Sequence, residues 1–170
     1  MNDAQAALVV CDAGPLIHLA QLDCLDLLAD FSRLVVPDVV WREVERHRPT
    51  ALNQKTIHIE RLEPSEEPSP ELIAAHRLLV LHAGEAQALQ LAQELRADLF
   101  LTDDTAARLA ARMFKVSAHG TLGILLRAIR RQQRTRVEIL EVLDALPNRS
   151  TLHVKRELLD EVIRLVQDLK

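Results

Sequence analysis

The stretch Leu8–Gln21, LVVCDAGPLIHLAQ, passes from four apolar residues through one acid, Asp12, into Ala-Gly-Pro and an amphipathic segment. A short, continuous apolar run is typical of a strand that is buried on both faces in a parallel sheet. Pro15 suits the first turn of a helix, because its fixed φ is helical and its missing N–H would be unpaired there anyway. We therefore expect a buried strand over Ala7–Cys11 that ends at Asp12 and is followed at once by a helix.

The same order of an apolar run and a helical pattern recurs along the chain. Further strands are expected over 33–37, 99–102 and 115–117, with an edge strand over 57–62. Helices are expected over 16–30, 38–47, 71–81, 85–96, 105–114, 120–133, 137–146 and 154–169. Such alternation predicts an α/β fold with a parallel sheet.

Length and composition are those of an ordinary globular domain. The chain has 170 residues, of which 48% are apolar and 27% charged. Its 21 basic and 25 acidic residues give a net charge of −4, so any nucleic-acid binding would need a local basic patch. Cys11 and Cys24 form no CxxC pair, the first residues do not resemble a signal peptide, and no apolar run approaches the roughly 18 residues of a membrane helix. We expect a cytoplasmic protein without membrane contact.

Acidic residues follow several of the expected elements. Asp12 and Asp103 each come directly after an apolar strand, Glu85 stands at a helix start, and Glu43 lies about one turn into the helix after strand 33–37. The carboxyl ends of parallel strands share one edge of a sheet, where ligands usually bind. We therefore expect these carboxylates to meet at that edge.

Carboxylates within about 4–6 Å of one another raise each other's pKa unless a cation compensates them. Oxygen ligands suit Mg²⁺ or Mn²⁺, and such an ion can activate water and neutralise a phosphate. These are the requirements of phosphodiester hydrolysis. The alternatives are ordinary ones: Asp12 or the pair Asp103-Asp104 could cap helices, Glu85 could interact with the helix dipole, and Glu43 could lie on a solvated helix face.

Five segments together resemble the PIN-domain family, in the group related to VapC-type toxins of toxin–antitoxin pairs. They are VVCDAGPLIHLA, VVPDVVWREV, GEAQALQLAQEL, ADLFLTDDTAARLA and HGTLGILLRA, between Val9 and about Ala128. The resemblance implies a three-layer α/β/α sandwich with a central, mainly parallel sheet. It also implies a cluster of acids that binds Mg or Mn and cuts RNA.

Carried over by position, the catalytic acids are Asp12, Glu43, Glu85 and Asp103. The resemblance implies metal ligands at Asp12, Glu85 and Asp103, with Asp104 as a fifth or substitute acid. It also implies that Thr102 supplies a small hydroxyl beside the last acid, near the substrate. The sequence departs from the family pattern after the first acid, where Ala13-Gly14 stands in place of a Ser or Thr.

The resemblance is tighter over residues 1–134, which we expect to form the PIN-like nuclease domain. Residues 135–170 resemble the extra helices of a subgroup that is often encoded beside a small antitoxin. The apolar face of the last helix could pack on the same domain, form a homodimer or receive an antitoxin helix.

Arginines supply candidate contacts to RNA phosphates. The spacing of Arg127, Arg130, Arg131 and Arg134 predicts one basic helical face, and Arg108 and Arg112 lie one turn apart close to the acids. The alternative is a solvated helix face. Because the chain has no Tyr, one Trp and three Phe, recognition by shape and backbone is favoured over base stacking.

We consider three functions. The first is a Mg- or Mn-dependent endoribonuclease, the toxin of a toxin–antitoxin pair. The second is a catalytically inactive PIN-like module that acts in regulation or assembly, for which the Ala13-Gly14 departure is the motive. The third is a phosphotransfer domain, but a dehalogenase-like site would need an acid at Gly14.

Overall fold

The computed structural model describes residues 7–65 and 67–169, and within these ranges five strands form one sheet. All strand pairs are parallel, and the order across the sheet is β3-β2-β1-β4-β5. The strands are β1 (Leu8–Cys11), β2 (Arg33–Pro37), β3 (Ile59–Leu62), β4 (Leu99–Leu101) and β5 (Ala118–His119). The first six residues, on which our expectation about a signal peptide falls, lie outside the described residues.

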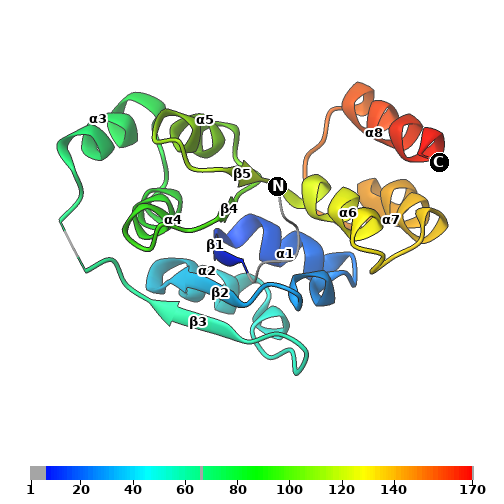
Figure 1. The fold of residues 1–170 in the computed structure, drawn as a ribbon, viewed down its shortest axis with the longest axis horizontal. Helices are drawn as coiled ribbons and strands as arrows, with labels where there is room; N and C mark the ends of the chain where they lie inside the picture. The colour runs from blue at the N-terminus through cyan, green and yellow to red at the C-terminus, as the bar shows by residue number, and fades with distance from the viewer. Residues whose placement is uncertain (1–6, 66, 170) are drawn as a thin grey trace.

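Helices cover both faces of the sheet and make three layers (Figure 1). One side carries α1 (Ala13–Gln21), α2 (Asp38–His47), α6 (Thr121–Arg130), α7 (Arg136–Arg149) and α8 (Arg156–Asp168), and the other carries α3 (Pro70–Leu79), α4 (Ala83–Glu94) and α5 (Thr105–Met113). Two short 3-10 turns, η1 (Leu25–Leu28) and η2 (Pro49–Ala51), follow α1 and α2. This architecture confirms the predicted α/β/α fold with a central parallel sheet.

The opening apolar run is buried on both faces, as its pattern predicted. Val9 and Cys11 belong to the cluster that includes α1 and α6, whereas Val10 belongs to the cluster that includes α4 and α5. Successive side chains of a strand point to opposite faces, so a central strand with helices on both sides needs an apolar residue at every position. β1 therefore lies at the centre of the sheet and delivers Asp12 to its carboxyl edge.

The C-terminal helices share the core of the rest of the chain. α6 contacts α1, α7 contacts α6, and α8 contacts α7. Ile139 and Leu143 of α7 and Val166 of α8 are fully buried in the same apolar cluster as Val9. The division that we placed after residue 134 stays a prediction. No helix in the described ranges combines the length and the apolar character needed to cross a membrane.

The first helix is shorter than its apolar spacing suggested. We expected it over 16–30, but α1 ends at Gln21, and Asp23 adopts a left-handed conformation with φ of 55°. The chain continues into η1, and Leu25 and Leu28 are buried there. Leucines three residues apart fit a 3-10 turn as well as an α-helix, so the spacing could not locate the break.

Three other boundaries differ from expectation for local reasons. Gly84 lies inside the first turn of α4 instead of breaking the chain before it. The last strand lies at Ala118–His119 rather than 115–117, because Lys115 has φ of 57° and reverses the chain after α5. α6 ends at Arg130, two residues before Gln132, which has φ of 58°.

Candidate active site

Two of the predicted acids lie together at the carboxyl edge of neighbouring strands. Cys11 of β1 pairs with Leu101 of β4, and the Asp12 amide donates to the Leu101 carbonyl oxygen at 2.8 Å. Asp103 follows two residues after Leu101. The parallel register therefore brings Asp12 and Asp103 to one edge, as the sequence indicated.

Asp12 is a buried carboxylate with 8% of its surface exposed. As the N-cap of α1, its Oδ1 accepts a hydrogen bond from the Ala13 amide at 2.8 Å, and its Oδ2 accepts one from Thr102 Oγ1 at 3.2 Å. Burial, with smaller contributions from the charges of Glu85 and Glu43, raises the pKa of Asp12 to about 7, although the two hydrogen bonds oppose the shift. Asp12 thus combines the capping role with a site that disfavours its own charge.

The start of α4 brings further carboxylates to Asp12. A Cβ on Gly84 would lie 3.6 Å from Asp12 Oδ1 and also 3.6 Å from Glu43 Oε2, so both acids border the same small space. Glu43 itself is exposed on α2. A glycine at this position leaves room between α1, α2 and α4, which a side chain would partly fill.

Glu85 sits in the third position of α4 and closes a capping box. Its Oε2 accepts from the His82 amide at 2.8 Å, and its Oε1 lies 3.2 Å from His82 Nδ1. The hydrogen bond and charge of Glu85 raise the pKa of the His82 ring. Glu85 is 9% exposed, and its charge acts on Asp12. Glu85 therefore both closes the capping box and belongs, with Asp12 and Glu43, to a group of acids that we call the acid cluster.

Asp103 is held by two residues that sequence reasoning missed. Its Oδ1 accepts from the Thr121 amide at 2.6 Å; its Oδ2 accepts from Thr121 Oγ1 at 2.7 Å and lies 2.7 Å from His18 Nδ1. Burial raises the pKa of Asp103, but the bonds from His18 and Thr121 outweigh it and hold this pKa below its usual value. Asp103 is therefore an ionised, fixed carboxylate, unlike Asp12.

Gly120 is required for this close approach. A Cβ at residue 120 would lie only 2.5 Å from Asp103 Oδ1 and 3.1 Å from Arg108 Nη1. The glycine thus lets the start of α6 reach the Asp103 carboxylate, and it places the Arg108 guanidinium beside the same acid. The segment HGT, which lies in one of the five family-like segments, was the available signal for Gly120 and Thr121.

Thr102 and Asp104 have structural roles that differ from those expected. Thr102 is fully buried, donates to Asp12 and accepts from the Asp104 amide at 3.2 Å. This corrects our expectation of a substrate contact, because the hydroxyl has no access to solvent and instead positions Asp12. Asp104 caps α5 by accepting from the Ala107 amide at 2.8 Å, which is the capping alternative stated above.

The predicted basic face on α6 does not form. Arg127 donates to both oxygens of Asp30 at 2.9 Å and lies over the Phe31 ring at 4.4 Å, and Arg131 donates to Asp30 at 3.2 Å. Because α6 ends at Arg130, Arg134 lies off the helix, and it pairs with Asp26. These ion pairs tie α6 to the region of η1, so the expectation of one phosphate-binding helical face is corrected; Arg130 remains exposed.

The acids around Gly84 fit a divalent cation. No Lys or Arg in the described ranges forms an ion pair with Asp12, Glu43 or Glu85, and the donors are all carboxylate oxygens, which Mg²⁺ and Mn²⁺ prefer. Burial and the neighbouring carboxylates raise the pKa of Asp12, so a bound cation would favour its ionised form. Within the part of the chain that is described, no three acidic, His or Cys side chains are already close enough to enclose an ion, so binding requires their side chains to close in.

Comparison with known proteins agrees with this geometry. A family model described as a PIN domain matches residues 8–168. No curated protein matches the chain. PIN domains are generally nucleases and typically use divalent metal ions. The match over nearly the whole described chain, together with the fold, shows that this protein belongs to the PIN-domain family.

Proposed function

We propose that this protein is a Mg- or Mn-dependent endoribonuclease, and that it is the toxin component of a toxin–antitoxin pair. The observation that carries the proposal is the position of Asp12. This buried carboxylate borders Glu43 across Gly84, and its pKa is raised to about 7 by burial and, to a smaller extent, by the charges of Glu85 and Glu43. A metal-dependent nuclease needs several carboxylate oxygens at one place, because they hold the cation that approaches the phosphate.

Each acid has a distinct part in this proposal. Asp12, Glu43 and Glu85 would hold the cation, and Thr102 keeps Asp12 oriented toward it. Asp103 would supply a further carboxylate whose direction is set by Thr121 and His18. When bound, the cation would lower the pKa of a water molecule and offset the negative charge of the phosphate.

Arg108 would hold the substrate on the Asp103 side. Its Nη1 lies beside Gly120, and the same position adjoins Asp103 Oδ1. A guanidinium there would donate to a phosphate oxygen and would balance part of the negative charge of the acids. Asp103 is thus flanked by the group that would bring the phosphodiester bond to the acid cluster.

Incubation of the purified protein with mixed RNA and Mn²⁺ tests the activity. We expect cleavage that EDTA abolishes and that Asp12→Asn and Glu85→Gln each reduce at least 100-fold. Asp144→Asn, an exposed acid on α7, is the matched control and should retain wild-type cleavage. Cleavage that survives in EDTA or in Asp12→Asn would refute the proposal.

One observation favours the catalytically inactive PIN-like module as the second candidate. The oxygens of Asp103 already accept from Thr121 and contact His18, and Ala13 follows the first acid without a hydroxyl. If these contacts exclude a cation, calorimetric titration of the protein with Mn²⁺ will give no heat that depends on Asp12. In that case RNA will remain intact, and only the module is supported.

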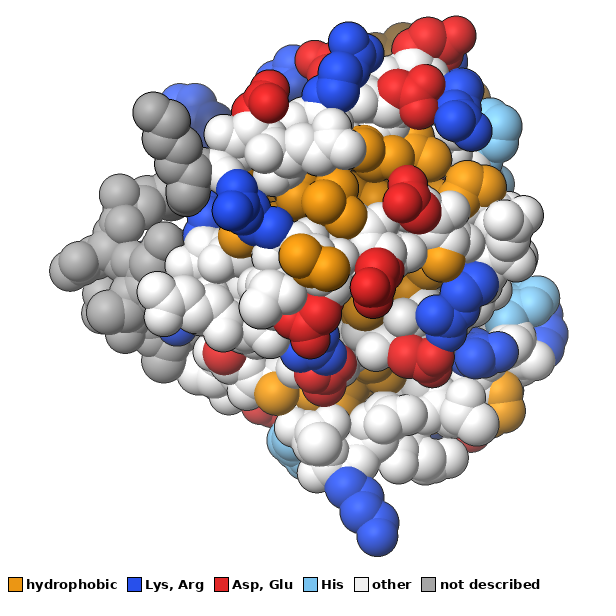
Figure 2. Space-filling view, turned by 90° about the vertical axis from the view of Figure 1, so that its right-hand side faces the viewer, with side chains coloured by type: hydrophobic (Ala, Val, Ile, Leu, Met, Phe, Trp, Pro, Cys, Tyr) orange, Lys and Arg blue, Asp and Glu red, His pale blue; other side chains and the backbone are white. Residues whose placement is uncertain are grey.

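The toxin role also predicts a small protein partner. Figure 2 shows hydrophobic side chains gathered among acidic and basic ones on the side of the molecule where the C-terminal helices lie. Leu158 and Leu165 of α8 and Val137 of α7 are among the large apolar residues that remain exposed. We expect the product of the neighbouring reading frame to form a complex with this chain and to relieve growth arrest. A homodimer is the competing use of this face, and light scattering of the purified protein separates the two.

A further inference from the structure

Three cations on and after α5 differ from the arginines of α6. Arg108 and Arg112 are four residues apart and lie on one side of α5, and Lys115 follows two residues after the end of this helix. Within the described ranges none of them forms an ion pair with an acid, whereas Arg127 and Arg131 are both bonded to Asp30. Cations without internal partners remain able to bind a ligand anion.

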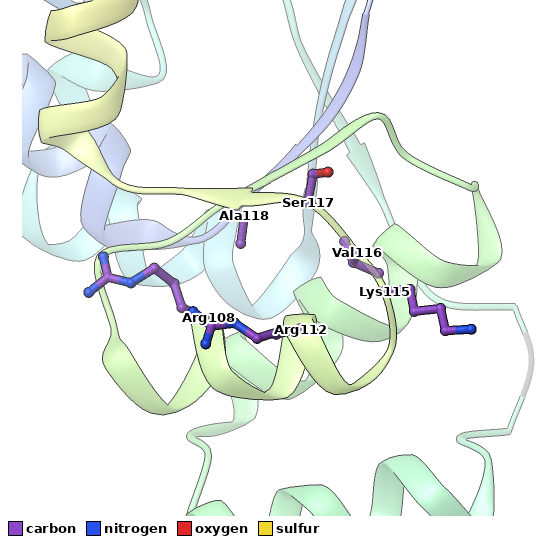
Figure 3. A pocket seen from close by; sticks show the side chains of 6 residues that line it. All are labelled: Arg108, Arg112, Lys115, Val116, Ser117 and Ala118. Atoms are coloured by element: carbon purple, nitrogen blue, oxygen red, sulfur yellow. The ribbon is translucent and has the colours of Figure 1, made fainter. Parts of the chain in front are cut away.

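These three residues line a surface hollow (Figure 3). The hollow has a volume of about 390 Å³ and lies between α5 and the segment that enters β5. Its remaining lining residues are Val116, Ser117 and Ala118. Figure 3 shows Arg108 and Lys115 at opposite ends of it, with Arg112 between them. Its lining contains no acid.

A second hollow of about 500 Å³ adjoins the first and reaches Asp103. Arg108 and Ala118 line both hollows, and the second is also lined by Asp103. Its other side is formed by the C-terminal segment, in which His153 and Lys155 face the same space. The two hollows therefore make one groove that runs from Asp103, past Arg108, to Lys115.

The C-terminal side of the groove is held in place by α1. Gln21 Oε1 accepts hydrogen bonds from Ser150 Oγ at 3.0 Å and from the Thr151 amide at 2.8 Å. These bonds dock the segment that precedes His153 onto the same helix that Asp12 caps. The C-terminal extension is thus a built part of the groove.

The chemistry of the groove matches the backbone of a polynucleotide strand. Arg108 and Arg112 lie about 6 Å apart along the axis of α5, and Lys115 continues the row of cations past the end of the helix. Neither hollow is lined by Phe or Trp, and the only aromatic rings among their lining residues are the imidazoles of His119 and His153. The cations of the groove bind phosphates and are indifferent to base identity.

We propose that this groove holds the RNA strand beside the acid cluster, with Lys115 and Arg112 binding backbone phosphates on one side of Arg108 and Lys155 binding them on the other. Of the residues that line this groove, the sequence indicated Arg108 and Arg112 as candidate phosphate contacts. Lys115, His153 and Lys155 are identified from the tertiary structure. The choice of RNA rests on the proposed nuclease function. The binding of a strand by these cations is tested without any cleavage.

Fluorescence anisotropy with a labelled 20-nucleotide single-stranded RNA of mixed sequence, in EDTA, tests the groove. The variants are Lys115→Glu and Lys155→Glu, one for each hollow. Arg96→Glu is the matched control, because Arg96 is exposed, lines neither hollow and shares the left-handed conformation of Lys115, with φ of 50° against 57°. Far-UV circular dichroism of each variant confirms that it is folded.

We expect Lys115→Glu and Lys155→Glu each to weaken binding about fivefold or more at 0.1 M salt, since one phosphate contact contributes a salt slope of about 0.7 for a single strand. The slope of log K against log salt should fall by about 0.7 in each. Arg96→Glu should bind within twofold of wild type. A DNA strand of the same sequence should show the same pattern if the backbone alone is read.

The outcomes separate this groove from the nuclease proposal. Equal losses in all three variants, or no binding by the wild type, overturn the groove. Unchanged binding in Lys115→Glu and Lys155→Glu also overturns it, even if Mn²⁺-dependent cleavage is found. The expected binding pattern without any cleavage supports the groove and refutes the nuclease.

Discussion

Substituting Asp12 by Asn should stabilise the metal-free protein at neutral pH. The folded state raises the pKa of this carboxyl from 3.8 to about 7, chiefly by burial and then by the charges of Glu85 and Glu43. A group whose pKa is higher in the folded state contributes its full stabilisation at pH values below its unfolded-state pKa. This contribution is lost as the pH rises through its folded-state pKa. Asn keeps an oxygen for the Ala13 amide that Asp12 now accepts from, and it carries no charge to bury.

The magnitude follows from the two pKa values. Linkage gives an upper limit of about 4 kcal/mol for the advantage of Asp12→Asn at pH 7 to 8, about 2 kcal/mol at pH 5, and almost none below pH 3.8. The sign is unusual for a candidate active-site substitution, since removal of the group stabilises the fold. The proposed nuclease function would explain why a carboxylate that lowers stability stands at this position.

Urea unfolding in EDTA, followed by circular dichroism between pH 4 and 8, measures this difference. Asp104→Asn is the matched control, because Asp104 also caps a helix and Asn caps equally well. Mn²⁺ should then stabilise the wild type and leave Asp12→Asn unchanged. The reasoning is refuted if Asp12→Asn is less stable than the wild type at pH 8, or if their difference does not vary with pH.

Three further substitutions test the surroundings of the acids. Gly120→Ala should push the Asp103 carboxylate aside, because the new Cβ would lie 2.5 Å from Asp103 Oδ1. The Mn²⁺ affinity measured by calorimetry should then fall by about 10- to 100-fold. An unaltered affinity would contradict the close approach of residue 120 to Asp103. Thr121→Val removes the hydroxyl that donates to Asp103 at 2.7 Å, so the pKa of the Asp103 carboxyl should rise. The free energy of unfolding in urea at pH 7 should fall by about 1–3 kcal/mol. An unchanged urea midpoint would count against this role of Thr121. Arg127→Ala should lower the free energy of unfolding by about 1.5–3 kcal/mol through loss of the ion pair with Asp30. RNA binding in EDTA should stay at the wild-type level. Weaker RNA binding by a variant of unchanged stability would restore a substrate role for this arginine.

The parts of the fold that depend on near neighbours in the chain could be predicted from the sequence. The apolar runs of β1, β2 and β4 indicate strands buried on both faces, because each position must be apolar when helices cover both sides of a sheet. A parallel sheet then places residues that follow its strands at one edge, so Asp12 and Asp103 could be brought together without coordinates. Glu85 could be placed near a helix start from the glycine before it and the helical pattern after it, whereas its capping box with His82 could not be predicted.

Contacts between distant segments were decided by the tertiary structure alone. His18 meets Asp103 across 85 residues, and Arg127 meets Asp30 across 97, and no local pattern encodes either pairing. Burial raises the pKa of both acids, and their partners decide the different outcome: the bonds from His18 and Thr121 lower the pKa of Asp103, whereas the bonds to Asp12 do not outweigh its burial. Sequence spacing specifies which side of a helix a residue occupies. What that side faces is determined by the packing of α1, α5, α6 and the C-terminal segment, because this packing depends on how apolar surfaces far apart in the chain are buried together.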